Sequence, residues 1–214
     1  MTDQANGPIL VCFAVKEEAA PFLRALPPGV ETLITGMGAG AAERAFTARF
    51  DERPWRCVFT CGFAGGLNPA LRPETVLCDT DGNFPLRQAL LDAGAAPGSF
   101  CHHTRVLTTS DEKRQAREAS RADAVEMESE VIRHLCHARG IPGATVRVIS
   151  DAADEELPLD FNALMTGDGK LNLGKLALAI LRRPQNIPAL MALGKRSKSA
   201  AARLAAVLRA TLTG

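Results

Sequence analysis

Continuous apolar runs that stop abruptly at glycine or acidic residues constrain the fold of this chain most strongly. Pro8–Val15 (PILVCFAV) ends at a Lys-Glu-Glu triplet, and Arg56–Cys61 (RCVFTC) ends at a glycine. Such runs are typical of strands that are buried on both faces of a parallel sheet. Helical patterns alternate with the strands, and no repeat or linker interrupts them before about residue 165. The sequence therefore predicts a single α/β domain with a mostly parallel sheet.

Glycine-rich turns follow two of the predicted strands. Residues 36–40 (GMGAG) follow a predicted strand at Glu31–Thr35, and residues 62–67 (GFAGGL) follow the run that ends at Cys61. Turns of this kind expose backbone N–H groups to an anion and let a ligand approach closely. A single turn is weak support for a site, because glycine also serves tight packing.

Acidic residues stand at two further junctions. We expect residues 126–128 (EME) at the start of a helix, and the next predicted strand, Ala144–Ile149, is followed by Ser150 and Asp151. Ligands of open α/β sheets bind in the crevice outside the carboxyl ends of the strands. The junctions together therefore predict one crevice that is equipped for acid–base chemistry on a polar small molecule.

The composition argues against several classes of protein. The net charge of +1 gives no sign of nucleic-acid binding. The six cysteines form no CxxC pair and lack zinc-ligand spacing, so we expect a reduced, cytoplasmic protein without a metal site. The N-terminus lacks a signal-peptide pattern, and no apolar run reaches the roughly 18 residues of a membrane span.

The middle of the chain has weaker patterns. We expect strands at Glu74–Cys78 and Arg105–Thr109, a helix over Asn83–Ala93, a loop at Gly94–Gly98 and a helix that Ser110 caps. These elements continue the alternation of strands and helices.

The C-terminal segment is basic and apolar. No acidic residue follows Asp168, whereas nine Lys and Arg residues do, and helical patterns cover residues 170–180, 187–193 and 199–212. We therefore divide the chain into an α/β domain at residues 1–165 and a helical extension at residues 166–214. Such an extension can pack on the domain or on a partner subunit, which is the commoner outcome. It can also lie on an anionic membrane.

The ordered junctions resemble those of the purine nucleoside phosphorylase and nucleosidase superfamily, especially its methylthioadenosine/S-adenosylhomocysteine nucleosidase branch. Phe13–Glu18 (FAVKEE), Thr35–Gly40 (TGMGAG) and Thr60–Leu67 (TCGFAGGL) are similar to its first junctions. Val125–Ser129 (VEMES) and Arg147–Asp154 (RVISDAAD) are similar to its most diagnostic pair. The resemblance implies a three-layer fold with a central mixed, mostly parallel sheet that is flanked by helices, with extra C-terminal helices.

The resemblance implies a catalytic pair. Asp151 matches the aspartate that protonates purine N7 as the glycosidic bond breaks, and Ser150 would help to orient it. Glu18 matches the glutamate that activates water in the nucleosidase branch. Adenine leaves poorly as an anion, so a proton donor is needed, and the nucleophile needs a base on the opposite face. The alternative is that Asp151 caps a helix and that Glu18 only complements a helix dipole.

The resemblance also implies a set of substrate-binding residues. Glu128 matches the glutamate that hydrogen-bonds the ribose hydroxyls, and Met127 matches the methionine that packs on the sugar. Glu126 matches a glutamate near the same sugar. Helix-start electrostatics is the alternative role for Glu128. The glycine-rich turn adds Phe63, Ala64 and Gly65 to this set.

Two departures from the superfamily concern the nucleophile. Phe63 stands where the superfamily has a serine that contacts water or phosphate, and Thr60 stands where its phosphorylases have an arginine. The loss of both donors favours hydrolysis over phosphorolysis. Phosphate stays open as a co-substrate, because Arg44 or Arg72 could reach the site. No other cofactor is implied.

The region over the 5′ side of the nucleoside differs as well. The segment between Gly66 and Arg105 is shorter than in the superfamily, so we expect the loop that covers the 5′ side to shrink to about Asp79–Phe84. The chain also has no tyrosine to stack on base or sugar. A more open pocket suits a bulkier 5′ substituent. Together with the basic tail, it resembles the hopanoid-associated branch, which implies an adenosylhopane-like lipid nucleoside as substrate. Methylthioadenosine and S-adenosylhomocysteine are the alternatives.

Functions of two other classes stay open. A nucleoside-binding protein that has lost turnover would explain Phe63, but it has little use for a proton donor at Asp151. A membrane-surface adaptor would rest on the tail alone. The resemblance implies a homo-oligomer that binds a small purine nucleoside and no nucleic acid, in the cytoplasm or peripherally at a membrane.

Overall fold

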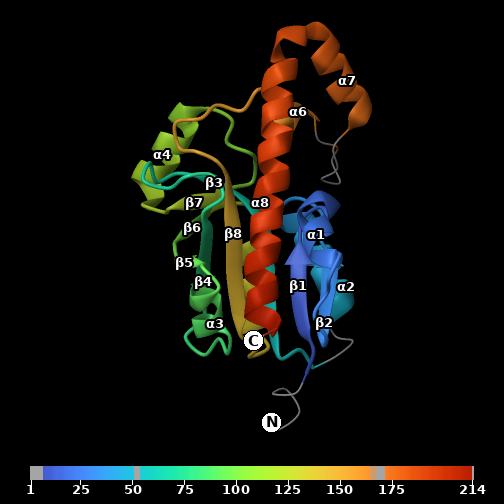
Figure 1. The fold of residues 1–214 in the computed structure, drawn as a ribbon, viewed down its shortest axis with the longest axis vertical. Helices are drawn as coiled ribbons and strands as arrows, with labels where there is room; N and C mark the ends of the chain where they lie inside the picture. The colour runs from blue at the N-terminus through green and yellow to red at the C-terminus, as the bar shows by residue number, and fades with distance from the viewer. Residues whose placement is uncertain (1–6, 51–53, 165, 167–171, 214) are drawn as a thin grey trace.

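A mixed sheet forms the centre of the molecule (Figure 1). The computed structural model describes residues 7–50, 54–164, 166 and 172–213. The strands of the sheet are β1 (Ile9–Phe13), β2 (Val30–Ile34), β3 (Cys57–Gly66), β4 (Val76–Thr80), β5 (Ala96–Pro97), β6 (Phe100–His102), β7 (Ala124–Glu126) and β8 (Gly143–Asp151). Their main order is β2-β1-β3-β8-β4-β5, and β7 pairs with both β3 and β6. Strands β1, β2, β3 and β8 are parallel, whereas β4 is antiparallel to β8.

Helices cover both faces of this sheet. The described helices are α1 (Lys16–Leu23), α2 (Ala39–Phe50), α3 (Arg87–Asp92), α4 (Ser110–Ser120), α5 (Ser129–His137), α6 (Phe161–Leu164), α7 (Leu173–Arg182) and α8 (Ile187–Thr213), with a 3₁₀ turn at Pro184–Asn186. One face carries α1, α3 and α8, and the other carries α2 and α5. The predicted fold class is therefore confirmed.

The burial of both faces explains the continuous apolar strands. Ile9, Val11 and Phe13 of β1 pack with α1, α3 and α8, whereas Leu10 and Cys12 pack with α2 and α5. Successive side chains of a strand point to opposite faces, so a strand that is covered on both sides is apolar throughout.

The predicted strand at Arg105–Thr109 is wrong. These residues form an irregular segment in which Val106 donates its N–H to Asn162 Oδ1 (2.8 Å) and accepts from Asn162 Nδ2 (2.9 Å). One side-chain amide thus takes the backbone hydrogen bonds that a neighbouring strand would supply. Thr109, rather than the predicted Ser110, caps α4 by accepting from the N–H of Glu112 (3.2 Å).

Residues 126–128 do not start a helix as predicted. Glu126 ends β7, and Glu128 is the N-cap residue of α5. Glu126 Oε2 accepts from the N–H groups of Glu128 (3.0 Å) and Ser129 (2.7 Å), so its side chain satisfies the first donors of α5 from outside the helix. The loop predicted at Gly94–Gly98 similarly contains the short strand β5.

The segment Asp79–Phe84 lies away from the place where the sequence predicts a cover. The N–H of Asp81 donates to Gly143 O (3.0 Å), and Asp81 Oδ2 accepts from Gly143 N (2.6 Å). These contacts place the segment at the start of β8, because β4 runs antiparallel to that strand. Since Asp151 is at the other end of β8, the predicted cover is wrong in its location.

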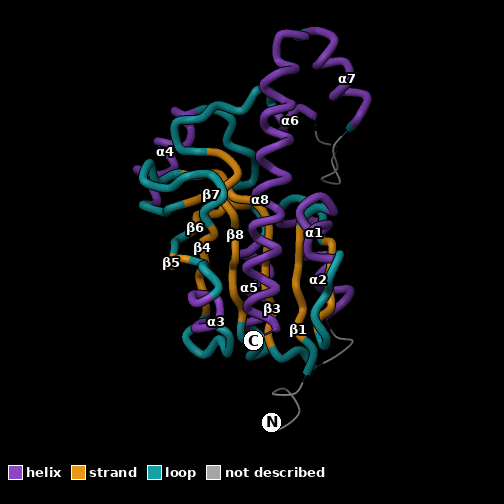
Figure 2. The backbone as a smooth tube through the Cα atoms, in the orientation of Figure 1, coloured by secondary structure: helices purple, strands orange, loops and turns teal. Residues whose placement is uncertain are grey.

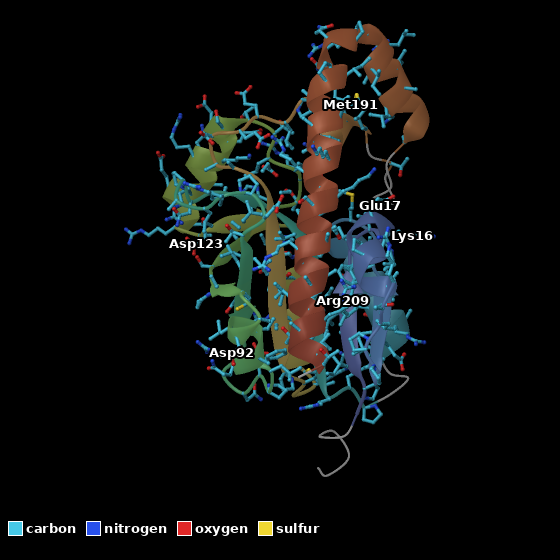
Figure 3. The ribbon with its side chains drawn as sticks, viewed as in Figure 1. Lys16, Glu17, Asp92, Asp123, Met191 and Arg209 are labelled. Carbon is cyan, nitrogen blue, oxygen red and sulfur yellow. The ribbon has the colours of Figure 1, made fainter. Side chains whose placement is uncertain are left out.

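The C-terminal helix α8 has two different halves. It is continuous, although the sequence predicts two helices there, and its second half packs on the sheet through Ala200, Leu204 and Leu208. Its first half and α7 stand above the sheet (Figure 1). Met191, labelled on this part in Figure 3, is 71% exposed. Among the described helices, none combines the length and the apolar character needed to cross a membrane.

Candidate active site

A cavity of about 270 Å³ lies at the carboxyl ends of the central strands. Figure 2 shows β1, β3 and β8 side by side, and residues at or just beyond the ends of all three line the cavity. It brings together every residue that the sequence predicts for the site. These residues are Glu18, Phe63, Ala64, Gly65, Glu126, Met127, Glu128, Ser150 and Asp151. Their roles in binding and catalysis stay predictions.

Backbone donors from two elements hold Glu18 in the first turn of α1. Its Oε2 accepts from the N–H groups of Ala14 (3.1 Å) and Val15 (3.3 Å), and its Oε1 accepts from Phe63 N (2.9 Å). Burial raises the pKa of Glu18 to about 7, although Arg147 and the backbone donors act in the opposite direction. A carboxyl group with this pKa can exchange a proton with water near neutral pH.

Arg147 joins the acidic positions of the site. It is 2% exposed, and its Nη2 donates to Glu126 Oε2 (2.7 Å) and Glu128 Oε2 (3.2 Å). The same nitrogen donates to Ser129 Oγ (2.9 Å). Burial alone would lower the pKa of Arg147, but Glu126, Glu128 and Glu18 raise it above its usual value. Arg147 is therefore a permanent cation beside the carboxylates that line the cavity.

Sequence reasoning assigned no role to Arg147, although a signal was present. The residue interrupts an otherwise apolar strand that is predicted to be buried on both faces. An arginine in such a place is rarely fully buried without a charged partner. The nearby carboxylates at Glu126 and Glu128 are the partners that this argument requires.

Gly62 allows Glu18 and Arg147 to approach the same point of β3. A Cβ at this position would lie 2.8 Å from both carboxylate oxygens of Glu18 and 2.8 Å from Arg147 Nη1. The φ of Gly62 is 149°, a conformation that residues with a side chain rarely adopt. Both the space and the backbone therefore require glycine here.

Glu126 and Glu128 have different surroundings. Burial would raise the pKa of Glu126, but Arg147 and nearby hydrogen-bond donors hold it at about 2. Glu128 Oε1 accepts from Gly38 N (2.9 Å), which ties the carboxylate to the glycine-rich turn before α2. Glu126 is thus a buried anion that organises the interior, whereas Glu128 links two walls of the cavity.

Asp151 is held through both carboxylate oxygens. Oδ1 accepts from Ser150 Oγ (2.6 Å), which is consistent with the orienting role that the resemblance implies. Oδ2 accepts from Lys113 Nζ (2.5 Å). Lys113 lies on α4 outside the cavity lining, and sequence reasoning missed it. A highly charged helix gives no local sign that one of its lysines faces inward.

The cover of the cavity comes from segments that the sequence did not connect with the site. They are the irregular segment before α4, the chain after β8, and helices α6 and α8. Their residues in the lining are Arg105, Val106, Leu107, Leu157, Phe161, Leu193 and Ser197. The cover is mostly apolar, and α8 forms part of the cavity wall.

The charges around the cavity offer few ligands for phosphate or metal. Arg44 and Arg72, which the sequence offers as phosphate ligands, lie outside the lining. Among the described residues of the lining, the positive side chain is Arg105, which pairs with Glu112 (2.7 Å). Within the part of the chain that the structure describes, no group of three or more His, Cys, Asp or Glu side chains could hold a metal ion.

Comparison with known proteins gives a consistent result. A family model described as the phosphorylase superfamily matches residues 86–182. The 5′-methylthioadenosine/S-adenosylhomocysteine nucleosidase of an Exiguobacterium species is 27% identical over 188 residues, which span 72% of this chain and 80% of that protein. The resemblance to the nucleoside phosphorylase and nucleosidase superfamily is confirmed. The prediction of an enzyme of this superfamily is confirmed with it.

Two solved structures have the same fold. Futalosine hydrolase of Helicobacter pylori superposes with a TM-score of 0.69 and 17% identity, over 97% of each chain. The methylthioadenosine/S-adenosylhomocysteine nucleosidase of the same organism, solved with butyl-thio-DADMe-Immucillin-A, gives a TM-score of 0.70 and 17% identity, over 97% of this chain and 98% of that chain. The domain boundary, the homo-oligomer, the cytoplasmic location and the lack of a cofactor stay predictions.

Proposed function

We propose that this chain hydrolyses the N-glycosidic bond of a 5′-substituted adenosine and releases adenine. The observation that carries this proposal is the pair Glu18 and Asp151, two buried carboxyl groups that line one cavity from different elements. Hydrolysis of a nucleoside needs a base for water and an acid for the leaving purine. The relatives named as methylthioadenosine/S-adenosylhomocysteine nucleosidases support the same reaction class.

Each carboxyl group has one task in the proposed reaction. Glu18 takes a proton from water as the water oxygen bonds to C1′ of the sugar. The C1′–N9 bond breaks, its electron pair goes to adenine, and Asp151 gives a proton to N7. Glu128 accepts hydrogen bonds from the ribose hydroxyls and places negative charge near the positive charge that develops on the sugar. Met127 packs on the sugar.

The charges in the cavity favour water over phosphate as the nucleophile. Three carboxyl groups of the lining, Glu18, Glu126 and Glu128, lie around the buried guanidinium of Arg147, and that guanidinium already donates to two of them. A phosphate dianion at this place would meet more negative than positive charge. The half-exposed Arg105 is engaged with Glu112 and is the residue that phosphorolysis would have to use.

The apolar cover supports a substrate with an apolar 5′ substituent. Leu157, Phe161 and Leu193 contribute side chains to the cavity wall, and Leu193 belongs to the helix that continues into the projecting part of the chain. We propose an adenosylhopane-like lipid nucleoside as the preferred substrate, with methylthioadenosine and S-adenosylhomocysteine as alternatives.

Adenine release from a panel of nucleosides tests this function. The panel contains methylthioadenosine, S-adenosylhomocysteine, inosine, adenosine and a 5′-alkyl adenosine, each with and without phosphate. We expect adenine release at rates that phosphate leaves unchanged, with the largest kcat/KM for the 5′-alkyl compound. Strict phosphate dependence would contradict hydrolysis. Binding without release from any of these compounds would favour an inactive nucleoside-binding protein, the alternative that Phe63 supports.

We also propose that the projecting helices contact an anionic membrane. Leu181 and Met191 are 79% and 71% exposed there, although large apolar side chains usually avoid water. Basic residues accompany them on α7 and the first half of α8: Lys175, Arg182, Lys195, Arg196 and Lys198. Apolar side chains flanked by Lys and Arg are typical of helices that lie at the surface of anionic bilayers. This surface would bring the cavity close to a lipid substrate.

Sedimentation with vesicles that contain an anionic phospholipid tests the membrane contact. We expect the protein to sediment with these vesicles, and we expect the variant L181E/M191E to lose most of that binding. The variant L23E/L26E is a matched control, because Leu23 and Leu26 are also exposed, at 43% and 42%, but lie at and just beyond the end of α1. Equal partitioning of the wild type and L181E/M191E would contradict the contact.

A further inference from the structure

Lys113 is the buried charge that the proposed reaction leaves unexplained. It lies on α4, is 1% exposed and directs its ammonium group inward, although α4 is otherwise a polar surface helix. A lysine is almost never fully buried unless its charge is paired. Here the partner is Asp151, at 2.5 Å between Nζ and Oδ2.

The contacts of Lys113 use all of its donors. Besides Asp151, Nζ donates to the carbonyl oxygens of Ala152 (2.7 Å) and Glu155 (2.7 Å). An ammonium group has three donors and no acceptor, so this environment is complete. Lys113 thus fixes both the carboxyl group of Asp151 and the chain that follows β8, from a position behind the cavity wall.

We infer that Lys113 is a positioning residue that holds Asp151 and supplies the proton that Asp151 passes to the leaving purine. The inference deepens the proposed function and rests on it. Both oxygens of Asp151 accept hydrogen bonds, Oδ1 from Ser150 Oγ and Oδ2 from the ammonium of Lys113, so in this arrangement the carboxylate carries no proton of its own to give. The ammonium of Lys113 is in direct contact with it and carries the missing proton.

The proton balance of this step is simple. Lys113 Nζ transfers one proton to the Asp151 carboxylate, which leaves a neutral amine beside a carboxylic acid. As the C1′–N9 bond breaks, the acid gives that proton to N7 of the purine and becomes a carboxylate again. After the products leave, Glu18 returns to the solvent the proton that it took from the nucleophilic water, and the amine of Lys113 takes one proton from the solvent, so the protein gains and loses no net proton. The nucleoside loses adenine, and the protein returns to its starting state.

The test compares two leaving groups, one that needs a proton and one that does not. It therefore separates a role of Lys113 in protonation of the leaving group from general support of the folded structure. A p-nitrophenyl riboside departs as a stable phenolate and needs no proton, whereas adenine does need one. We compare K113M and K113Q with the wild type on both substrates. Gln retains hydrogen-bond donors without a transferable proton, so it keeps the test valid if K113M does not fold.

We expect adenine release by K113Q to fall about 100-fold, in the range of general acid catalysis, while nitrophenolate release stays within a few fold of wild type. The ratio of the two rates is independent of the folded fraction. R117M is the matched control, because Arg117 on the same helix also donates to two carbonyls and one carboxylate, away from the cavity. R117M is expected to leave this ratio unchanged.

Two other outcomes are informative. Equal loss of both activities in K113Q, or loss of neither, would overturn the role of Lys113 while the proposed function stands. Release of neither leaving group by the wild type would overturn the proposed function, and the inference with it.

Discussion

Replacement of Asp151 by asparagine is expected to lower adenine release by about 10³-fold, in the range of general acid catalysis. Asparagine is similar in size, its oxygen can accept from Lys113, and its NH2 group can donate to Ser150 Oγ, so both partners of the native carboxyl group keep a hydrogen bond. It cannot protonate N7. Nucleoside binding should therefore survive, because the sugar contacts proposed for Glu128 and Met127 are untouched.

The measurement for D151N is kcat for the best nucleoside of the panel, together with its Kd from calorimetry. D154N is the matched control, since Asp154 is exposed three residues further along the chain and lies outside the cavity lining. It should behave as wild type. Turnover by D151N at the wild-type rate would remove Asp151 as the acid. Loss of binding together with turnover would instead point to a structural role.

Replacement of Glu18 by glutamine is expected to remove the general base of the proposed reaction. It is also expected to remove the loss of folding stability that the wild type shows as pH rises. Hydrolysis should fall by about 10²- to 10⁴-fold, because Gln cannot take a proton from water. In the wild type, kcat/KM should rise with pH through about 7, the value to which burial raises the pKa of Glu18. Below this pH the carboxyl group is protonated and cannot act as a base.

The same pKa makes a prediction for stability. The folded protein binds the Glu18 proton more tightly than the unfolded chain does, since the pKa rises from 4.5 to about 7. This contribution favours folding below pH 4.5 and is lost as pH rises to 7. The free energy of unfolding of E18Q relative to wild type should therefore increase by about 2 to 3 kcal/mol between pH 5 and pH 8.

Urea unfolding at the two pH values measures this difference. E17Q is the matched control, because Glu17 is the exposed neighbour in the same helix turn (Figure 3). The control should show no change in relative stability and normal activity. A relative stability of E18Q that is constant between pH 5 and pH 8 would contradict a buried, proton-binding Glu18.

The sequence predicted the site residues at the ends of the strands better than the segments that cover the cavity. Glu18, Asp151 and the glycine-rich turn at 62–67 follow apolar runs directly, so their meeting at one edge of a parallel sheet follows from local pattern and topology. The cover could not be predicted in this way. Val106 satisfies its backbone through a side-chain amide from Asn162, more than fifty positions along the chain, and no local pattern announces such a contact.

The sequence also did not predict which charged side chains are buried. Lys113 stands in a helix of mostly charged residues, where each one has the same local expectation of facing water. Its inward direction depends on the carbonyl groups after β8, which α4 meets only in the folded molecule. Arg147 was easier in principle, because a charge within an apolar strand is conspicuous.

The continuity of α8 connects the projecting helices rigidly to the core of the molecule. The same helix carries Met191 at its projecting end, Leu193 and Ser197 in the cavity wall, and Leu204 in the core. Arg196 also pairs with Glu155, whose carbonyl accepts from Lys113. A tilt of the outer half of α8 relative to its buried half would therefore displace a wall of the cavity. Through the pair of Arg196 and Glu155, it would also displace the segment after β8 that surrounds Asp151.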